Sequence, residues 1–111
     1  MVVNKDSDAL YFSREPIPSP WKGIKNLTMY MQTGIIAFRR EALLKFNKMN
    51  ETILEQTESV DMNRVIEMGG SIRMVATEFK TIGVDTPQEL KDSEKLMEND
   101  STLTRYQKNY E

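Results

Sequence analysis

The sequence contains neither cysteine nor histidine. Without cysteine it has no disulfide, no thiolate zinc site and no cysteine nucleophile, and without histidine it has no imidazole base and no Ser-His-Asp triad. Any chemistry in these 111 residues must therefore use carboxylates, Arg, Lys, Ser, Thr, Tyr or a hard metal bound by oxygen. Mg²⁺ meets that description, because it binds oxygen ligands, often one or two carboxylates together with substrate phosphates.

Other absences narrow the class of protein. No apolar run approaches membrane-spanning length, and the first residues lack the basic and apolar regions of a secretory signal, so a cytoplasmic location is expected. The net charge of -2 comes without a clustered basic excess, which argues against a nucleic-acid partner. The five glycines include one adjacent pair, Gly69-Gly70, and do not form a phosphate-binding loop.

The first part of the chain predicts a hairpin, a stiff loop and a buried strand. Residues 1–3 and 9–14 are apolar and flank a polar turn, which is typical of two antiparallel strands. Residues 15–21 contain three prolines, which exclude a helix interior or a central strand. Residues 31–40 predict a buried strand whose core is Ile35–Phe38.

The rest of the chain alternates helical and extended patterns. Apolar spacing predicts helices over residues 40–49, 53–68 and 87–97, and strands over residues 72–76 and 80–84. The buried stripe of the first helix is predicted at Leu43, Leu44 and Phe46, and Gly69-Gly70 is predicted to end the second. This alternation of strands and helices indicates an α/β or α+β class.

One carboxylate, Asp85, stands between the predicted strand 80–84 and the following helix. Thr86 suits the N-cap, Pro87 loses no hydrogen bond at N1, and Glu89 completes a capping box. The helix start therefore does not need Asp85, whose side chain is left at the carboxyl end of a strand, where open α/β sheets place ligands. Two interpretations stay open, a polar loop residue near a positive helix end or a carboxylate of a metal or phosphate site.

Four segments, taken in order, resemble the C-terminal half of the 3-deoxy-manno-octulosonate cytidylyltransferases, the CMP-sugar synthetases of bacterial surface-polysaccharide synthesis. The segments are ALYFSREPIP, GIIAFRREALLKF, LEQTESVDMNRVIEMGGSIRMV and GVDTPQEL. The resemblance runs from about Ala9 to Met97, and its most specific parts are the YFSR-x-PIP and GVDTP patterns.

The resemblance implies a reaction, a metal and a fold. The family transfers CMP from CTP to the anomeric hydroxyl of the 3-deoxy acid with Mg²⁺ and releases pyrophosphate, for lipopolysaccharide or capsule synthesis. Its fold is α/β, a nucleotide-diphospho-sugar-transferase-like (Rossmann-like) mixed sheet with an antiparallel insertion. The implied partners are CTP, a 3-deoxy sugar acid and a second copy in a cytoplasmic homodimer, with no nucleic acid and no membrane.

The resemblance also assigns site residues. Asp85 matches the family's metal-binding aspartate and is the implied catalytic residue, while Arg14 matches an arginine that pairs with the sugar carboxylate. Ser13, Gln32 and Asp61 are the other implied substrate-binding residues. Three of these residues have a plainer alternative: Arg14 in a surface ion pair, Ser13 merely alternating along a strand, and Asp61 on a solvated helix face.

Departures from the family pattern indicate a divergent branch. Gln32 stands in place of a histidine, Ile36 of a tyrosine and Met62 of a glutamine, so the acceptor is expected to be 3-deoxy-manno-octulosonate or another sugar acid such as a different nonulosonate. The family's nucleotide-binding half, with its phosphate loop and second aspartate, has no counterpart here. Residues 1–97 are therefore expected to be a C-terminal sugar-binding and dimerisation part and residues 98–111 a polar tail, inactive alone. A non-catalytic sugar-binding or dimerisation module is the alternative.

Overall fold

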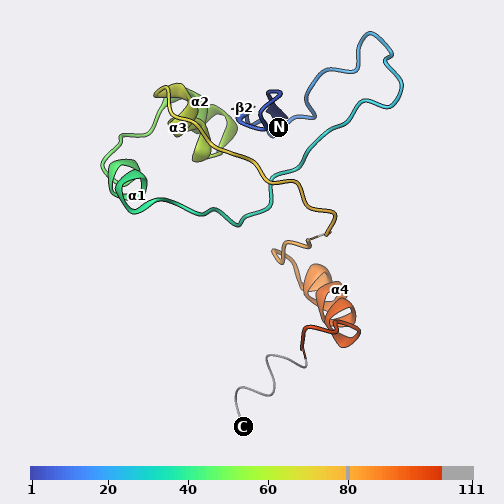
Figure 1. Ribbon diagram of the computed structural model, residues 1–111. Coiled ribbons are helices and arrows are strands. Elements are labelled where there is room, and N and C mark those ends of the chain that lie inside the picture. Colours follow the sequence, from blue (N-terminus) through green and yellow to red (C-terminus); the bar gives the residue numbers. More distant parts are fainter. Residues whose placement is uncertain (80, 104–111) are drawn as a thin grey trace. The chain divides into compact units, whose positions relative to one another are not determined.

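The computed structural model describes residues 1–79 and 81–103, which fall into two compact units (Figure 1). The first, Met1–Thr77, contains β1 (Val2–Val3), β2 (Ala9–Tyr11), α1 (Arg40–Phe46), α2 (Ile53–Glu58) and α3 (Met62–Glu67). The second begins at Glu78 and contains α4 (Pro87–Glu98). Strands and helices are thus both present, as predicted, whereas the predicted boundary between residues 97 and 98 stays a prediction.

The predicted N-terminal hairpin forms, but its second strand ends at Tyr11 rather than at residue 14. β1 and β2 pair antiparallel with Val2 opposite Tyr11 and a register shift of the kind a β-bulge makes. The Asn4 side chain closes the turn, since its Oδ1 accepts the backbone N–H groups of Asp6 and Asp8, each at 2.9 Å. The hairpin therefore fixes the position of the end of β2. The next residues include Ser13 and Arg14, two of the predicted site residues.

The predicted strand over residues 72–76 is reduced to a single bridge. Arg73 pairs antiparallel with Asp8, and the Ala9 N–H donates to the Ile72 carbonyl at 2.9 Å. The Arg73 Nε also donates to Asp8 Oδ1 at 2.6 Å. The prediction of a full strand was wrong because β2 spans only three residues and offers too few partners for a longer ladder.

Residues 31–40 do not form the predicted buried strand. Ile35 is 87% exposed, and within the predicted core only Phe38 packs, with its ring centroid 5.5 Å from that of Phe46. A strand needs a neighbour that takes up its N–H and C=O groups, and no described residue pairs with this segment. The same reason makes the prediction for residues 81–84 wrong, while residue 80 lies outside the described residues.

The predicted helix over residues 53–68 is two helices. Ser59 ends α2 in the left-handed conformation, with φ 54° and ψ 41°, and α3 begins at Met62. The Thr57 hydroxyl turns back to the Ile53 carbonyl at 2.7 Å, which competes with the helical hydrogen bonds near this end. The break lets α2 and α3 lie side by side as a helix pair (Figure 1). The end of α3 is as predicted, since Gly69 has φ 75°.

The core of the first unit joins β2 to α3. Among the described residues, Ala9, Phe12 and Met62 are its buried apolar side chains. Partly buried apolar residues surround them: Met1, Phe38, Phe46, Val60, Ile66, Ile72 and Met74. Burying a Phe or Met side chain contributes about 2 to 3 kcal/mol each, so this small core holds the hairpin onto the helix pair.

Helix α1 forms within the predicted range but keeps only part of its predicted buried stripe. Phe46 packs against the core, whereas Leu43 and Leu44 are each 42% exposed. The Phe46 ring also lies 4.6 Å from the Arg64 guanidinium carbon, a cation–π distance. One residue of α1, rather than three, therefore anchors this helix.

The start of α4 confirms the predicted capping box. The Thr86 hydroxyl accepts the Glu89 N–H at 3.2 Å, and the Glu89 carboxylate accepts the Thr86 N–H at 2.8 Å. Pro87 occupies the first helical position, as predicted. Throughout the part of the chain that the structure describes, no helix combines the length and the apolar character needed to cross a membrane.

Candidate functional site: a pocket beside the end of β2

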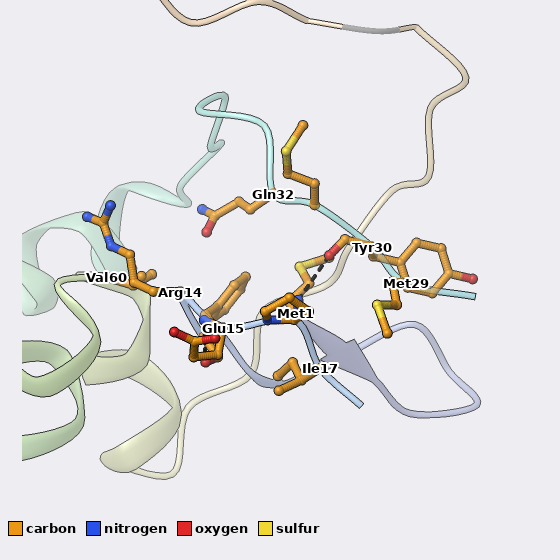
Figure 2. Close-up of a pocket in the computed structure, with 12 residues that line it drawn as sticks. Met1, Arg14, Glu15, Ile17, Met29, Tyr30, Gln32 and Val60 are labelled. Carbon is orange, nitrogen blue, oxygen red and sulfur yellow. Dashed lines mark hydrogen bonds between the residues drawn. The ribbon is translucent and has the colours of Figure 1, made fainter. Parts of the chain in front are cut away.

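A pocket of about 470 Å³ opens beside the end of β2 (Figure 2). Its walls come from residues 12–17, residues 29–32, Met1 and Val60. The Met1 nitrogen donates to the Tyr30 carbonyl at 2.9 Å and so ties two walls together. Three of the predicted substrate-binding residues, Ser13, Arg14 and Gln32, are brought together in this pocket from two separate segments.

The lining of the pocket combines apolar walls with few polar groups. The apolar side chains are those of Met1, Phe12, Pro16, Ile17, Met29, Tyr30 in part, Met31 and Val60. The polar side chains are those of Ser13, Arg14, Glu15 and Gln32. A mostly apolar hollow with a few polar groups, among them the cation Arg14 and the anion Glu15, is typical of a small-molecule site.

The Arg14 guanidinium lies against the C-terminal end of α2. Its Nε donates to the Glu58 carbonyl at 3.0 Å, and its Nη2 donates to the Ser59 carbonyl at 3.2 Å. These carbonyls belong to the negative end of the helix dipole, which favours a cation there. With respect to the described residues, these contacts use two of the five guanidinium N–H groups, so the two N–H groups of Nη1 and one of Nη2 keep their capacity to donate to a carboxylate.

The Glu58 carboxylate gathers three donors from the strand side. The Tyr11 hydroxyl donates to Oε1 at 2.8 Å, the Ser13 hydroxyl donates to Oε1 at 3.0 Å, and the Arg14 backbone N–H donates to Oε2 at 2.8 Å. The Arg14 N–H and then the Tyr11 hydroxyl lower the pKa of Glu58 below its ordinary value. The same contact raises the pKa of Tyr11, because ionised Glu58 favours the protonated hydroxyl. Glu58 therefore stays ionised at neutral pH.

The Asn63 side chain of α3 binds Phe12, the residue between Tyr11 and Ser13. The Asn63 Oδ1 accepts the Phe12 N–H at 3.1 Å, and the Asn63 Nδ2 donates to the Phe12 carbonyl at 2.9 Å. Asn63 is fully buried, with an exposed fraction of 0%. Glu58 and Asn63 together thus bind each residue from Tyr11 to Arg14.

Asp61 does not line this pocket. It lies on a separate hollow of about 270 Å³ with Glu51, Glu55, Gln56 and Ser59. Met62, which stands where the resembled family has glutamine, is buried in the core and offers no polar contact. Among the predicted substrate-binding residues, Asp61 is therefore the one that the structure does not bring to the pocket.

The helix pair is held together by an ion pair across the break. Arg64 donates through Nε to Glu55 Oε2 at 2.7 Å and through Nη2 to Oε1, and its Nη1 reaches the Met49 carbonyl at 3.1 Å. The hydrogen bond from Arg64 lowers the pKa of Glu55, and the hydrogen bond to Glu55 raises the pKa of Arg64. This fork-to-carboxylate geometry joins α2 to α3.

Asp85 lies in the second unit, ahead of α4. Its backbone N–H donates to Glu89 Oε2 at 3.1 Å, while its carboxylate is exposed and makes no hydrogen bond to a described residue. The capping box therefore leaves the carboxylate unused, as the sequence predicted. Within residues 1–79 and 81–103, no three acidic residues gather as a metal site.

Glu58 and Asn63 could not be recognised from the sequence as organisers of the pocket. Both contact residues more than forty positions away, and a hydrogen bond over that separation leaves no local pattern. The break at Ser59 hides them further, because an unbroken helix would direct Glu58 and Asn63 along different faces. Recognising Ser59-Val60 as a helix interruption is the one signal that could have pointed to them.

Similar sequences exist among curated proteins, although no family model matches the chain. The 3-deoxy-manno-octulosonate cytidylyltransferase of Christiangramia forsetii is 41% identical over 97 residues, which cover 87% of this chain and 39% of that protein. The protein of the same name from Geobacter metallireducens is 39% identical over 117 residues, covering 96% of this chain and 44% of the relative. That from Bacteroides thetaiotaomicron is 37% identical over 108 residues, covering 91% and 42%.

These matches extend over most of the chain, between 87% and 96% of it in these three. The chain spans about two fifths of the length of the relatives, between 39% and 44% in these three. The predicted resemblance is thereby confirmed by sequences of about 40% identity from different organisms. Over most of its length, the chain is therefore similar to part of the 3-deoxy-manno-octulosonate cytidylyltransferases.

Proposed function

We propose that this chain is the sugar-acid-binding, C-terminal part of a cytidylyltransferase. The observation that carries the proposal is the pocket beside β2, where Arg14 keeps free guanidinium donors and stands with Ser13 and Gln32. A carboxylate of a 3-deoxy sugar acid matches the free end of a guanidinium, because the two planar groups form paired hydrogen bonds. The names of the relatives supply the substrate class.

The proposed reaction belongs to the longer protein. It transfers CMP from CTP to the anomeric hydroxyl of 3-deoxy-manno-octulosonate and releases pyrophosphate. In this proposal Arg14 fixes the acid's carboxylate and Gln32 hydrogen-bonds its hydroxyls, while Ser13, whose own proton is donated to Glu58, accepts from one hydroxyl. The apolar walls limit the access of water. The proposed contact of Asp61 with the sugar stays a prediction, since Asp61 lies on a different hollow.

Mg²⁺ is the proposed cofactor, and Asp85 its proposed ligand from this chain. The exposed carboxylate makes no hydrogen bond to a described residue, so it is free to serve as one oxygen ligand. One carboxylate fits Mg²⁺ only in part, because the ion needs further oxygens from substrate phosphates, water or a second aspartate. When bound, Mg²⁺ would offset negative charge on the nucleotide phosphates.

The finer features of fold and assembly are also part of the proposal. Residues 31–40 and 81–84 would become strands of a Rossmann-like mixed sheet when neighbouring strands of a longer chain are present. Apolar residues such as Ile35 and Trp21 are exposed in this chain, which supports the proposal that further parts of a longer protein cover them. We place the longer protein in the cytoplasm as a homodimer, in lipopolysaccharide or capsule synthesis.

Pyrophosphate release from CTP, Mg²⁺ and 3-deoxy-manno-octulosonate tests the reaction. The longer protein that contains this segment should turn over, and the 111-residue chain alone should not. Asp85→Ala in the longer protein should abolish turnover and leave the far-ultraviolet circular dichroism unchanged. Steady turnover by the 111-residue chain, or full activity of Asp85→Ala, would refute the proposal.

One observation favours a related acid as the substrate. Met62 occupies the position of a family glutamine and is 2% exposed in the core, so no polar group at that position meets the sugar. A nonulosonic acid, which has one carbon more than 3-deoxy-manno-octulosonate, would need a different set of hydroxyl contacts. Competition between 3-deoxy-manno-octulosonate and N-acetylneuraminate for the longer enzyme distinguishes the two: the better substrate has the higher kcat/KM. If neither acid binds, a non-catalytic dimerisation module becomes the better description.

A further inference from the structure

We infer that Glu58 is a positioning residue that sets Arg14 for the sugar-acid carboxylate. The inference rests on the proposed function, in which Arg14 binds that carboxylate. Glu58 itself is not among the residues that line the pocket. It acts on the pocket through the segment that leaves β2.

The strand-side contacts of Glu58 converge on this short segment. Its two carboxylate oxygens accept from Tyr11, Ser13 and the Arg14 backbone N–H, at distances of 2.8, 3.0 and 2.8 Å. An ionised carboxylate suits this task because it accepts through both oxygens and donates nothing. The Glu58 side chain of α2 therefore determines how residues 11–14 run past the pocket.

Arg14 contacts the same residue twice. Its backbone N–H meets the Glu58 carboxylate, and its Nε meets the Glu58 carbonyl at 3.0 Å. The two contacts close a ring through both residues, so a shift of the Glu58 side chain moves the base of the Arg14 side chain. The Ser59 carbonyl adds a third point of attachment at 3.2 Å.

Glu58 orients Arg14 without neutralising it. No ion pair among the described residues involves Arg14, and the Glu58 carboxylate binds the backbone of Arg14 rather than its guanidinium. The positive charge and the Nη1–Nη2 end thus remain for a ligand. A direct Glu58–guanidinium pair would instead have competed with the substrate carboxylate.

Glu58→Gln removes this function with little change of shape. Glutamine offers one acceptor oxygen to three donors, and its amide nitrogen would face a donor. The matched control is Glu67→Gln on α3. Glu67 also accepts a backbone N–H, from Leu54 at 3.0 Å, and makes no hydrogen bond to residues 11–14.

The first test measures the order of the Arg14 side chain in the unliganded chain by ¹⁵N relaxation of its Nε–H. Glu58→Gln should convert an ordered Arg14 Nε–H into a mobile one, whereas Glu67→Gln should leave it ordered. This readout needs no sugar acid. An Arg14 Nε–H that stays ordered in Glu58→Gln would overturn the inference whatever the ligand proves to be.

The second test measures the Kd of 3-deoxy-manno-octulosonate by calorimetry. Arg14→Ala should raise the Kd by roughly tenfold or more, the usual cost of a charge-assisted contact. Glu58→Gln should raise the Kd severalfold, Glu67→Gln should not, and the double variant should match Arg14→Ala alone, because Glu58 acts only through Arg14.

The outcomes separate the two proposals. Binding by the unmodified chain with an unchanged Kd in Glu58→Gln, or fully additive effects in the double variant, would overturn the positioning role and leave the proposed function standing. Failure of the unmodified chain to bind the acid would overturn the proposed function, and with it the role of Glu58 toward that acid.

Discussion

Phe12 has both of its backbone polar groups taken up by one side chain. The Asn63 amide donates to its carbonyl and accepts from its N–H, at 2.9 and 3.1 Å, as a neighbouring strand would. Because Phe12 and Asn63 are both buried, this pair replaces water at the centre of the first unit. The position of the pocket-lining segment thus depends on a residue that lies outside the pocket.

Asn63→Ala should destabilise the first unit by about 2 kcal/mol, since it leaves a buried N–H and a buried carbonyl without partners. Urea unfolding followed by circular dichroism measures this change. Asn50→Ala is the control, because Asn50 is exposed in the same unit, and it should change the free energy of unfolding by less than about 0.5 kcal/mol. Equal effects of the two substitutions would contradict the account.

Acidification should weaken the first unit through Glu55 and Glu58. Arg64 lowers the pKa of Glu55 and the Arg14 N–H lowers the pKa of Glu58, both from an ordinary value of 4.5. A lowered folded-state pKa gives stability that is complete above the ordinary value and is lost as the pH falls through the folded value. The free energy of unfolding should therefore be flat at neutral pH and decline below about pH 4.5.

Glu55→Gln provides the comparison for this pH dependence. It should lower stability at pH 7 and flatten the decline below pH 4.5, the ordinary value for this carboxyl. Glu94→Gln, on α4 in the other unit, should reproduce the profile of the unmodified chain. A decline of the same depth in Glu55→Gln would show that the Glu55–Arg64 pair does not contribute.

At the scale of elements, the features set by local sequence were predictable. The Thr86–Glu89 capping box and the stop at Gly69 depend on residues within one turn of the chain. The Ser59 break was not predictable in the same way, because residues on both sides have helical spacing and the packing of α2 on α3 decides the outcome. Local propensity is a weak guide where tertiary contacts oppose it.

Ser59→Gly should stabilise the first unit by about 0.5 to 1 kcal/mol, because glycine adopts the left-handed conformation at a helix end without strain. Gln56→Gly, in the exposed interior of α2, should destabilise it by about 1 kcal/mol. Thermal unfolding of both variants measures whether each substitution raises or lowers the stability of the first unit. Destabilisation by Ser59→Gly would show that α2 does not end at this residue in solution.

At the scale of the whole molecule, three predicted substrate-binding residues line one pocket, and their roles stay predictions, whereas predicted strands are absent from the described residues. The sequence resemblance identified Ser13, Arg14 and Gln32, and the structure places them in one pocket. Of the strands predicted over residues 31–40 and 80–84, neither forms within the described residues, because a strand depends on partners and none of the described residues supplies them. The apolar composition of a segment indicates that its side chains favour burial, but it does not show which other strand will pair with the segment.

Hydrogen exchange of backbone N–H groups should show whether residues 35–38 pair with another strand. The backbone N–H groups of residues 35–38 should exchange rapidly in this chain, where no described residue accepts from them. In the longer protein, where we propose that this segment joins a mixed sheet, the same groups should exchange at least about a hundredfold more slowly. Equal exchange rates in the two proteins would rule out a sheet built on this segment.

The most direct test of the central claim is the binding of 3-deoxy-manno-octulosonate to the 111-residue chain and to its Arg14→Ala variant, measured by calorimetry beside the methyl ester of the same acid. The account predicts binding of the free acid, loss of roughly tenfold or more in affinity for the ester, and a similar loss in Arg14→Ala. Equal affinities for acid and ester, or unchanged binding by Arg14→Ala, would contradict a carboxylate site at Arg14.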